Sequence, residues 1–238
     1  MESLARVKLL IGDKGIDKLK KMNVFVFGVG GVGSYCAEAL ARSGVGNINL
    51  IDYDKIEESN LNRQIQTDYS VLGEYKAEIM KNRISLYNSF TNVFVWNVKY
   101  PDPKLKEALK SADYIADCID MVSAKMDLIE YANINDIPII SSMGTANKMY
   151  PNKLEIGDIY KTEYCPLAKV VRKECRKRNI KKLKVVYSKE KSLIPVDENT
   201  KESKRTNGTM IYVPAVAGMM MASEIINLWI EEFVKWNK

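Results

Sequence analysis

The sequence contains no histidine among its 238 residues. This absence excludes Ser–His and Cys–His nucleophilic pairs, histidine-ligated metals and acid–base catalysis by imidazole. Any catalysis must therefore use carboxylates, lysines, arginines, backbone amides and a bound cofactor or hard cation.

Cysteine is scarce, and the four cysteines form no Cys-x-x-Cys pair: Cys36, Cys118, Cys165 and Cys175. This spacing argues against a structural zinc site and fits a reduced, cytoplasmic setting. Cys36 and Cys118 are expected in the core, on an apolar helix face and beside a strand. Cys165 and Cys175 leave room for a covalent acyl-enzyme step, although a non-catalytic role is favoured.

We expect neither an N-terminal signal peptide nor a membrane-spanning segment. Its first six residues are too polar for a signal peptide. The apolar run 210–230 is long enough to cross a membrane at roughly 20 residues. However, Glu224 lies inside this run, and Pro214 and Gly218 interrupt it. We therefore expect a buried helix of a soluble core and no membrane association, with interfacial attachment as the alternative.

The first half of the chain alternates strand and helix patterns. Short β-rich runs are expected at 24–27, 48–51, 93–95, 114–116 and 138–140, and helices at 34–42, 73–87, 104–110 and 122–133. Strands separated by helices pair in parallel through right-handed crossovers. The pattern predicts an α/β, Rossmann-like three-layer αβα fold with a mostly parallel sheet.

The regular alternation of strand and helix patterns ends after Ser142, so we expect the C-terminal third of the fold to be modified. Strands are predicted at 154–159 and 185–187, helices at 166–178 and 217–236, and a mobile polar loop at 192–208. No linker separates two units. We expect one domain over 1–238, with a nucleotide-binding half (1–145) and a substrate-binding, dimer-forming half (146–238).

A glycine-rich turn follows the first expected strand. Gly28, Gly30 and Gly33 satisfy the pattern G-x-G-x-x-G. Small residues let the backbone approach a phosphate or ribose, and the amides at a helix N-terminus favour an anion. Asp52 ends the second strand, where a carboxylate binds ribose hydroxyls. These features alone indicate a dinucleotide or ATP.

The segment after Asp52 favours ATP over a redox cofactor. It carries a polar cluster around Arg63, and Lys76 follows at the start of an expected helix. An arginine and a lysine near a glycine turn suit the concentrated charge of a triphosphate. Asp120 follows the fourth strand at the ligand-binding edge, where a carboxylate can hold Mg²⁺. Asp117 is the competing ligand, and one of the two aspartates can instead cap the next helix.

Positive charge is concentrated in one block. The formal net charge is +6, and the span 169–191 holds eleven Lys and Arg against two Glu. Such a block indicates a polyanionic partner, and the alternative is a solvated lysine-rich helix face. The candidate contacts are Lys169, Arg172, Lys173, Arg176, Lys177, Lys181 and Lys182.

Together these motifs resemble the ThiF-type adenylating family, which includes ubiquitin-activating enzymes and bacterial activators of sulfur-carrier proteins. The resemblance rests on G-x-G-G-x-G at 28–33 with Gly31, on Asp52, on the Asn60-x-x-Arg63-Gln64 pattern, and on Lys76 and Asp120. It implies adenylation of a carboxylate, with Asp52 on the ribose and Asn60, Arg63 and Lys76 on the phosphates. Asp120 would hold Mg²⁺, Asp54 and Gln64 would belong to the ATP site, and Arg6 would reach the ATP of a partner subunit.

The second half is similar to one branch of the family, the tRNA threonylcarbamoyladenosine dehydratases. The similar stretches are 141–148, 158–162, 165–172, 186–188 and 213–218. This resemblance implies a tRNA substrate for the basic block, no DNA partner, a homodimer and, as a further option, a sulfur-relay partner. The alternatives are an activator of a ubiquitin-like sulfur carrier, whose usual zinc-binding Cys-x-x-Cys pairs are absent, and an NAD-dependent protein.

Overall fold

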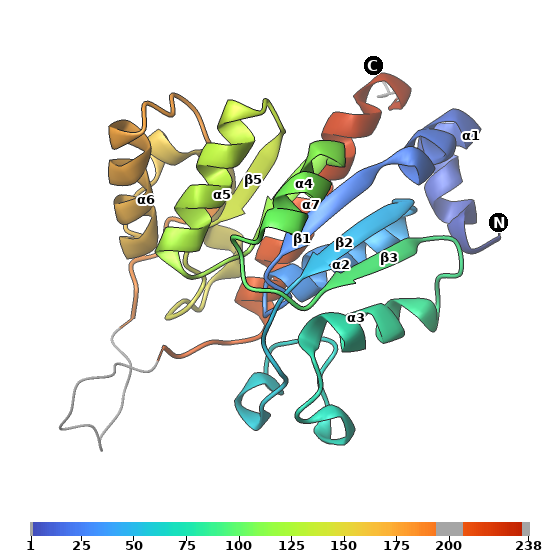
Figure 1. Cartoon of the computed structure of the whole chain (residues 1–238), viewed down its shortest axis with the longest axis horizontal. Coiled ribbons are helices and arrows are strands. Elements are labelled where there is room, and N and C mark those ends of the chain that lie inside the picture. Colours follow the sequence, from blue (N-terminus) through green and yellow to red (C-terminus); the bar gives the residue numbers. More distant parts are fainter. Residues whose placement is uncertain (1, 194–206, 235–238) are drawn as a thin grey trace.

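The computed structural model describes residues 2–193 and 207–234. Within them, seven strands form one sheet in the order β3-β2-β1-β4-β5-β7-β6. Figure 1 shows this sheet with the C-terminal elements β7, β6 and α6 at one end. The strands are β1 (Asn23–Phe27), β2 (Asn47–Ile51), β3 (Asn92–Trp96), β4 (Tyr114–Asp117), β5 (Ile139–Ser142), β6 (Leu154–Asp158) and β7 (Lys184–Ser188).

Six strands run in parallel, and β6 pairs antiparallel with β7 at the edge. The helices are α1 (Ala5–Lys21), α2 (Gly33–Ser43), α3 (Lys76–Ser85), α4 (Pro103–Ala108), α5 (Val122–Ile134), α6 (Pro166–Lys177) and α7 (Tyr212–Ile230). The predicted Rossmann-like α/β fold, with its mostly parallel sheet and altered C-terminal third, is confirmed.

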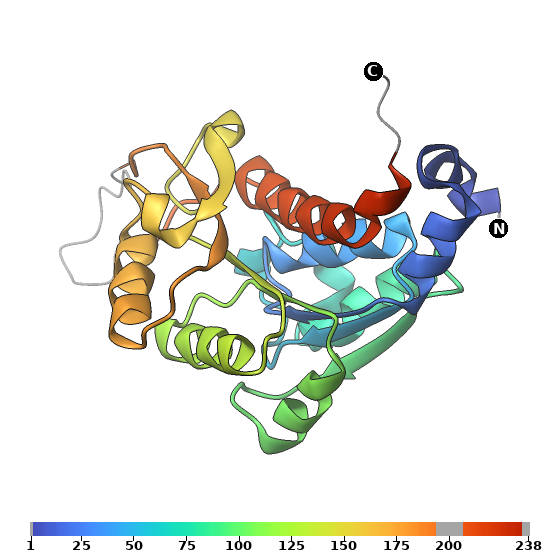
Figure 2. The ribbon, with the colours of Figure 1, turned by 90° about the horizontal axis from the view of Figure 1, so that it is seen from above.

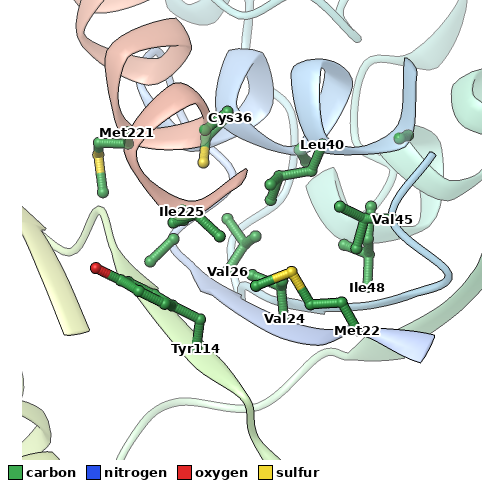
Figure 3. Close-up of a cluster of buried hydrophobic side chains, with 14 of the residues drawn as sticks. Met22, Val24, Val26, Cys36, Leu40, Val45, Ile48, Tyr114, Met221 and Ile225 are labelled. Atoms are coloured by element: carbon green, nitrogen blue, oxygen red, sulfur yellow. The ribbon is translucent and has the colours of Figure 1, made fainter. Parts of the chain in front are cut away.

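The two faces of the sheet follow from the alternation of side chains along each strand. In β1, Val24 and Val26 enter the core beneath α1, α2, α3 and α7, whereas Phe25 and Phe27 pack against α4 and α5. Figure 2 shows helices on both sides of the sheet, and Figure 3 shows the first core between α2, α7 and the strands. A third cluster joins α5 and α6 to β7. Both faces are therefore buried, as a parallel sheet requires.

The last helix, α7, begins at Tyr212, five residues before the predicted start at Ala217. Pro214 was expected to interrupt the run but lies in the first turn, where proline is tolerated. Gly218 lets α7 lie directly on α2, because a Cβ there would come within 2.3 Å of the Val32 carbonyl oxygen. Among the described residues, one helix, Tyr212–Phe233, is long and apolar enough to cross a membrane, and 44% of its apolar window is buried within the protein.

Helix α1 was missed by the sequence analysis. Its buried residues are Ile11, Gly15, Ile16 and Leu19, a spacing that marks one helix face, but lysines and Gly12 obscure it. Gly12 has φ 69 and kinks the helix. Of the predicted mobile loop 192–208, residues 194–206 lie outside the described residues.

Candidate functional site

A cleft of about 780 Å³ lies at the carboxyl ends of β1, β2 and β4. This is the edge of an open α/β sheet at which ligands bind. Ten of the predicted site residues line it: Gly28, Gly30, Gly31, Asp52, Asp54, Asn60, Arg63, Gln64, Lys76 and Asp120. Residues about 90 positions apart in the chain thus meet in one cavity.

The glycines of the turn have different roles. Gly28 has φ 82, which side chains rarely adopt, and a Cβ on Gly33 would lie 1.8 Å from the Gly28 carbonyl oxygen. Gly33 therefore closes the turn onto α2 and does not line the cleft. A Cβ on Gly30 would have no neighbour closer than Gln64 Nε2 at 3.9 Å, so the space before Gly30 is open to a ligand.

Asp52 is held at the floor of the cleft by two backbone amides. Its Oδ2 accepts from Val29 N at 2.7 Å, and its Oδ1 accepts from Asp54 N at 2.8 Å. Burial raises the pKa of Asp52, and these two bonds and the charge of Lys76 oppose that rise. Each carboxylate oxygen keeps a lone pair for a further donor, so Asp52 can accept ribose hydroxyls as predicted.

A glutamine that the sequence analysis missed completes the support of the turn. Gln66 is buried, and its Nε2 donates to the Val29 carbonyl oxygen at 2.8 Å. Asp52 and Gln66 therefore hold the two polar groups of Val29 between them, which fixes the glycine turn. The position of Gln66 in the sequence, two residues after Gln64, does not indicate this role.

Two cations approach the cleft, Arg63 from the segment between β2 and α3 and Lys76 from the start of α3. Lys76, the first residue of α3, is 8% exposed and its Nζ lies 2.8 Å from Asp54 Oδ2. The Arg63 guanidinium bonds the Ser59 carbonyl oxygen at 2.6 Å and Asn62 Oδ1 at 2.9 Å. Both cations thus have acceptors that a phosphate can replace.

Asn60 and Gln64 are buried beside Arg63. Asn60 Oδ1 accepts from Glu57 N at 3.2 Å and so holds the short helix Glu58–Asn60. Gln64 is 5% exposed, and its Oε1 has no hydrogen-bond partner. Because buried acceptors normally have a hydrogen-bond partner, Gln64 Oε1 is placed to accept from a donor group of a bound ligand.

The two aspartates after β4 have distinct positions. Asp117 is fully buried and accepts from Lys125 Nζ at 2.7 Å and from Ser141 Oγ at 2.6 Å. The Asp117 carboxylate is therefore neutralised within the core and is not a metal ligand. Asp120 is exposed in the cleft, as a ligand to a phosphate-bound cation requires. No group of three or more acidic, cysteine or histidine side chains suited to a metal occurs in the described part of the chain.

Apolar side chains that the sequence analysis did not single out also line the cleft, among them Phe27, Val98, Ile119, Met121 and Ala124. They come from β1, from the loop after β3, from the loop between β4 and α5, and from the start of α5. An apolar recess beside a cluster of polar groups is typical of a nucleotide site.

The basic residues predicted to contact a polyanionic partner differ in their exposure and in their own contacts. Lys169, Lys173, Lys181 and Lys182 are exposed on α6 and the loop after it. Arg172 instead turns inward, where its Nη1 donates to the Thr162 carbonyl oxygen at 2.8 Å and to Thr162 Oγ1 at 2.6 Å. Lys177 pairs with Glu174, and the Arg176 guanidinium lies 5.5 Å from the Tyr160 ring.

Of the remaining candidates, Cys118 lines the cleft, whereas Arg6, Cys36, Cys165 and Cys175 lie outside its lining. Arg6 is exposed on α1. Cys36, Cys165 and Cys175 are buried, and Cys118 is partly buried. Burial raises the pKa of Cys36 to about 12 and that of Cys175 to about 11. Cys165 caps α6, because its Sγ accepts from Ala168 N at 3.5 Å.

The pattern of the ThiF family matches residues 3–235, nearly the whole sequence. The chain belongs to the ThiF family. It is 38% identical to the tRNA threonylcarbamoyladenosine dehydratase of Bacillus subtilis over 238 residues, which covers 95% of this chain and 94% of that protein.

Two solved structures of the Escherichia coli tRNA N6-threonylcarbamoyladenosine dehydratase, TcdA, have the same fold. The structure in complex with AMP aligns with a TM-score of 0.89 and 29% identity, and covers 97% of this chain and 95% of that chain. The structure in complex with ATP aligns with a TM-score of 0.86 and 30% identity over the same shares of the two chains.

Proposed function

We propose that this ThiF-family chain is an ATP-dependent tRNA threonylcarbamoyladenosine dehydratase. The observation that carries this function is the likeness to the Bacillus subtilis and Escherichia coli dehydratases across the whole chain, including the C-terminal third. The cleft adds an independent argument, since it brings the expected ribose, phosphate and cation ligands together.

ATP is the nucleotide that the cleft fits. Asp52 accepts the ribose hydroxyls, the backbone at Gly30 approaches the phosphates, and the apolar recess receives the adenine base. Arg63 and Lys76 exchange their present acceptors for phosphate oxygens, which strengthens both contacts because phosphate carries more charge. Asp120 would hold Mg²⁺, which supplies charge neutralisation at the phosphates when bound.

In the first step, the threonyl carboxylate of the modified adenosine beside the anticodon attacks the α-phosphorus of ATP. An oxygen–phosphorus bond forms, the bond to the β-phosphate oxygen breaks, and pyrophosphate leaves. Arg63 and Lys76 stabilise the negative charge that develops on the phosphate oxygens. The product is an acyl-adenylate, in which a poor electrophile has become a mixed anhydride.

In the second step, the carbamoyl group of the same substituent attacks the activated carbonyl carbon. A ring closes, AMP leaves and the attacking group loses a proton. Both reactants belong to one substituent, so positioning contributes more than a strong base. This chemistry needs neither a histidine nor a cysteine nucleophile, which agrees with the buried Cys175.

The partners follow from the same proposal. The tRNA backbone lies on the exposed lysines of α6, and binding weakens as salt rises. A homodimer brings Arg6 of each protomer to the ATP of the other, and a sulfur-relay protein is an optional further partner. The cytoplasm is the compartment in which these substrates meet.

The direct experiment compares AMP formation with tRNA that carries the threonylcarbamoyl group and with tRNA that lacks it. We expect turnover only with modified tRNA and a loss of about 100-fold or more in Arg63→Ala, since one transition-state charge contact contributes on this scale. Arg63→Lys is the matched variant, which keeps the charge and loses the planar fork. Turnover that ignores the modification would rule out the proposal, and adenylation of a carrier protein ending in Gly-Gly would support the alternative activator.

A further inference from the structure

The segment between the cleft and the basic helix α6 contains an exposed tyrosine in an unfavourable backbone conformation. Tyr164 has φ 53, in the left-handed region that bulky residues rarely adopt, and its side chain is 54% exposed. Cys165 N donates to the Glu163 carbonyl oxygen at 2.6 Å, which closes a three-residue turn around Tyr164. A turn of this kind is rare and strained. An exposed ring contributes little to the core that would offset this strain, so the position of the ring calls for another explanation.

The turn joins the two functional surfaces described above. On one side, the Sγ of Cys165 would lie 3.4 Å from a Cβ on Gly144, a residue that lines the cleft, and Leu167 lines the cleft as well. On the other side, α6 begins at Pro166 and presents Lys169 and Lys173 to solvent. Tyr164 therefore lies in the short segment that joins residues at the cleft to the exposed lysines of α6.

A lysine side chain lies beside the ring of Tyr164. Lys191 Nζ lies 5.5 Å from the centroid of Tyr164, within the range of a cation–π interaction. An exposed aromatic face beside a positive charge fits an unpaired nucleotide, whose base stacks on the ring while its phosphate meets the cation. A base inside a duplex has no free face to offer, and an acidic peptide would use the charge without the ring.

We infer that Tyr164, with Lys191, is a stacking platform for an unpaired nucleotide of the RNA substrate, next to the one whose substituent reacts in the cleft. This inference deepens the proposed function and rests on it, because the modified adenosine lies beside an anticodon and therefore in a single-stranded loop. Its partner is a loop nucleotide of RNA, and the base need not be of one type, because every base has a π face.

The test separates the ring from the strained turn. Tyr164→Asn removes the ring and places a residue that tolerates the left-handed conformation, so we expect folding at least as stable as in the wild type. Tyr164→Phe keeps the ring. The matched control is Tyr69→Asn, because Tyr69 is also exposed (73%), lies in the segment between β2 and α3, and does not line the cleft.

Each full-length protein is titrated by fluorescence anisotropy with a short single-stranded RNA and with a fully paired RNA duplex. We expect Tyr164→Asn to bind the single strand about tenfold more weakly, with the duplex affinity, Tyr164→Phe and Tyr69→Asn unchanged. An unaltered single-strand affinity in Tyr164→Asn would overturn the inference, as would an equal loss in Tyr164→Phe or with the duplex.

AMP formation with modified tRNA is measured on the same wild-type protein as a separate readout. If the wild type fails to turn over, the proposed function is wrong, while the single-strand titration still decides whether Tyr164 stacks on RNA. If the wild type turns over, Tyr164→Asn is expected to raise KM for tRNA and to leave KM for ATP unchanged.

Discussion

Gly30 and Gly33 belong to the same turn, yet alanine at Gly33 should lower stability, whereas alanine at Gly30 should weaken ATP binding. In Gly33→Ala, the new methyl would lie 1.8 Å from the Gly28 carbonyl oxygen and 2.9 Å from its carbon. A Cβ atom essentially never lies under 3.0 Å from a non-bonded heavy atom, so the backbone must move by on the order of 1 Å. That movement strains the bonds from Gly28 N to Ile51 O and from Val29 N to Asp52. We predict a loss of about 3 kcal/mol or more in the free energy of unfolding, the upper end for overpacking.

In Gly30→Ala, the methyl meets no atom closer than 3.9 Å and projects into the cleft. The free energy of unfolding should stay within about 1 kcal/mol of the wild type. ATP affinity should fall about tenfold or more, because the methyl occupies space that the phosphate or ribose needs. The two losses, of stability in one variant and of binding in the other, identify the separate roles of the two glycines.

Urea unfolding followed by circular dichroism gives the stabilities, and calorimetric titration with ATP gives the affinities. If Gly30→Ala unfolds as easily as Gly33→Ala, the two glycines do not differ in their contacts as the structure shows. If Gly30→Ala binds ATP as tightly as the wild type, the ligand does not approach this backbone.

Three further predictions concern other parts of the molecule. Lys125→Met leaves the buried Asp117 carboxylate without its cation and should cost about 3–5 kcal/mol of unfolding free energy, whereas adding Asp117→Asn should restore most of this loss. Urea unfolding measures both variants. A loss below about 1 kcal/mol in the single variant would refute the buried pair. At pH 8, Cys36 and Cys175 of the native protein should resist alkylation, because their raised pKa values leave about one thiol in a thousand or fewer as thiolate. In denaturant, mass spectrometry should show all four thiols modified. Rapid labelling of Cys175 in the native protein would contradict this prediction. The double variant Lys169→Ala, Lys173→Ala should reduce the slope of log affinity for tRNA against log salt concentration by about one per lysine. Titrations at several salt concentrations measure this slope. An unchanged slope would show that the RNA binds elsewhere.

The parts of the site that the sequence predicts are those that a fixed local geometry requires. The glycine turn needs Gly28 at positive φ and Gly33 against a carbonyl oxygen, so its pattern is readable without a structure. Asp52 and Asp120 follow strands, and parallel strands deliver their carboxyl ends to one edge. Lys76 was expected at the start of a helix, and α3 begins there.

What the sequence could not predict depends on contacts between different elements. The role of Gln66 comes from a hydrogen bond across 37 positions, and the neutralisation of Asp117 comes from Lys125 on the next helix, α5, and from Ser141 on β5. The inward turn of Arg172 is set by Thr162, which no charge count reveals. Helix α1 was missed because its apolar positions are few and its outer face is rich in lysine.

The central claim is that this cleft activates a carboxylate on tRNA and closes a ring. The most direct measurement is the mass of the modified nucleoside, recovered from threonylcarbamoyl-tRNA after incubation with the protein and ATP. We predict a nucleoside lighter by one water molecule, formed in step with AMP and absent without ATP. An unchanged nucleoside mass while AMP accumulates would contradict it, and would show that the adenylated carboxylate belongs to another molecule.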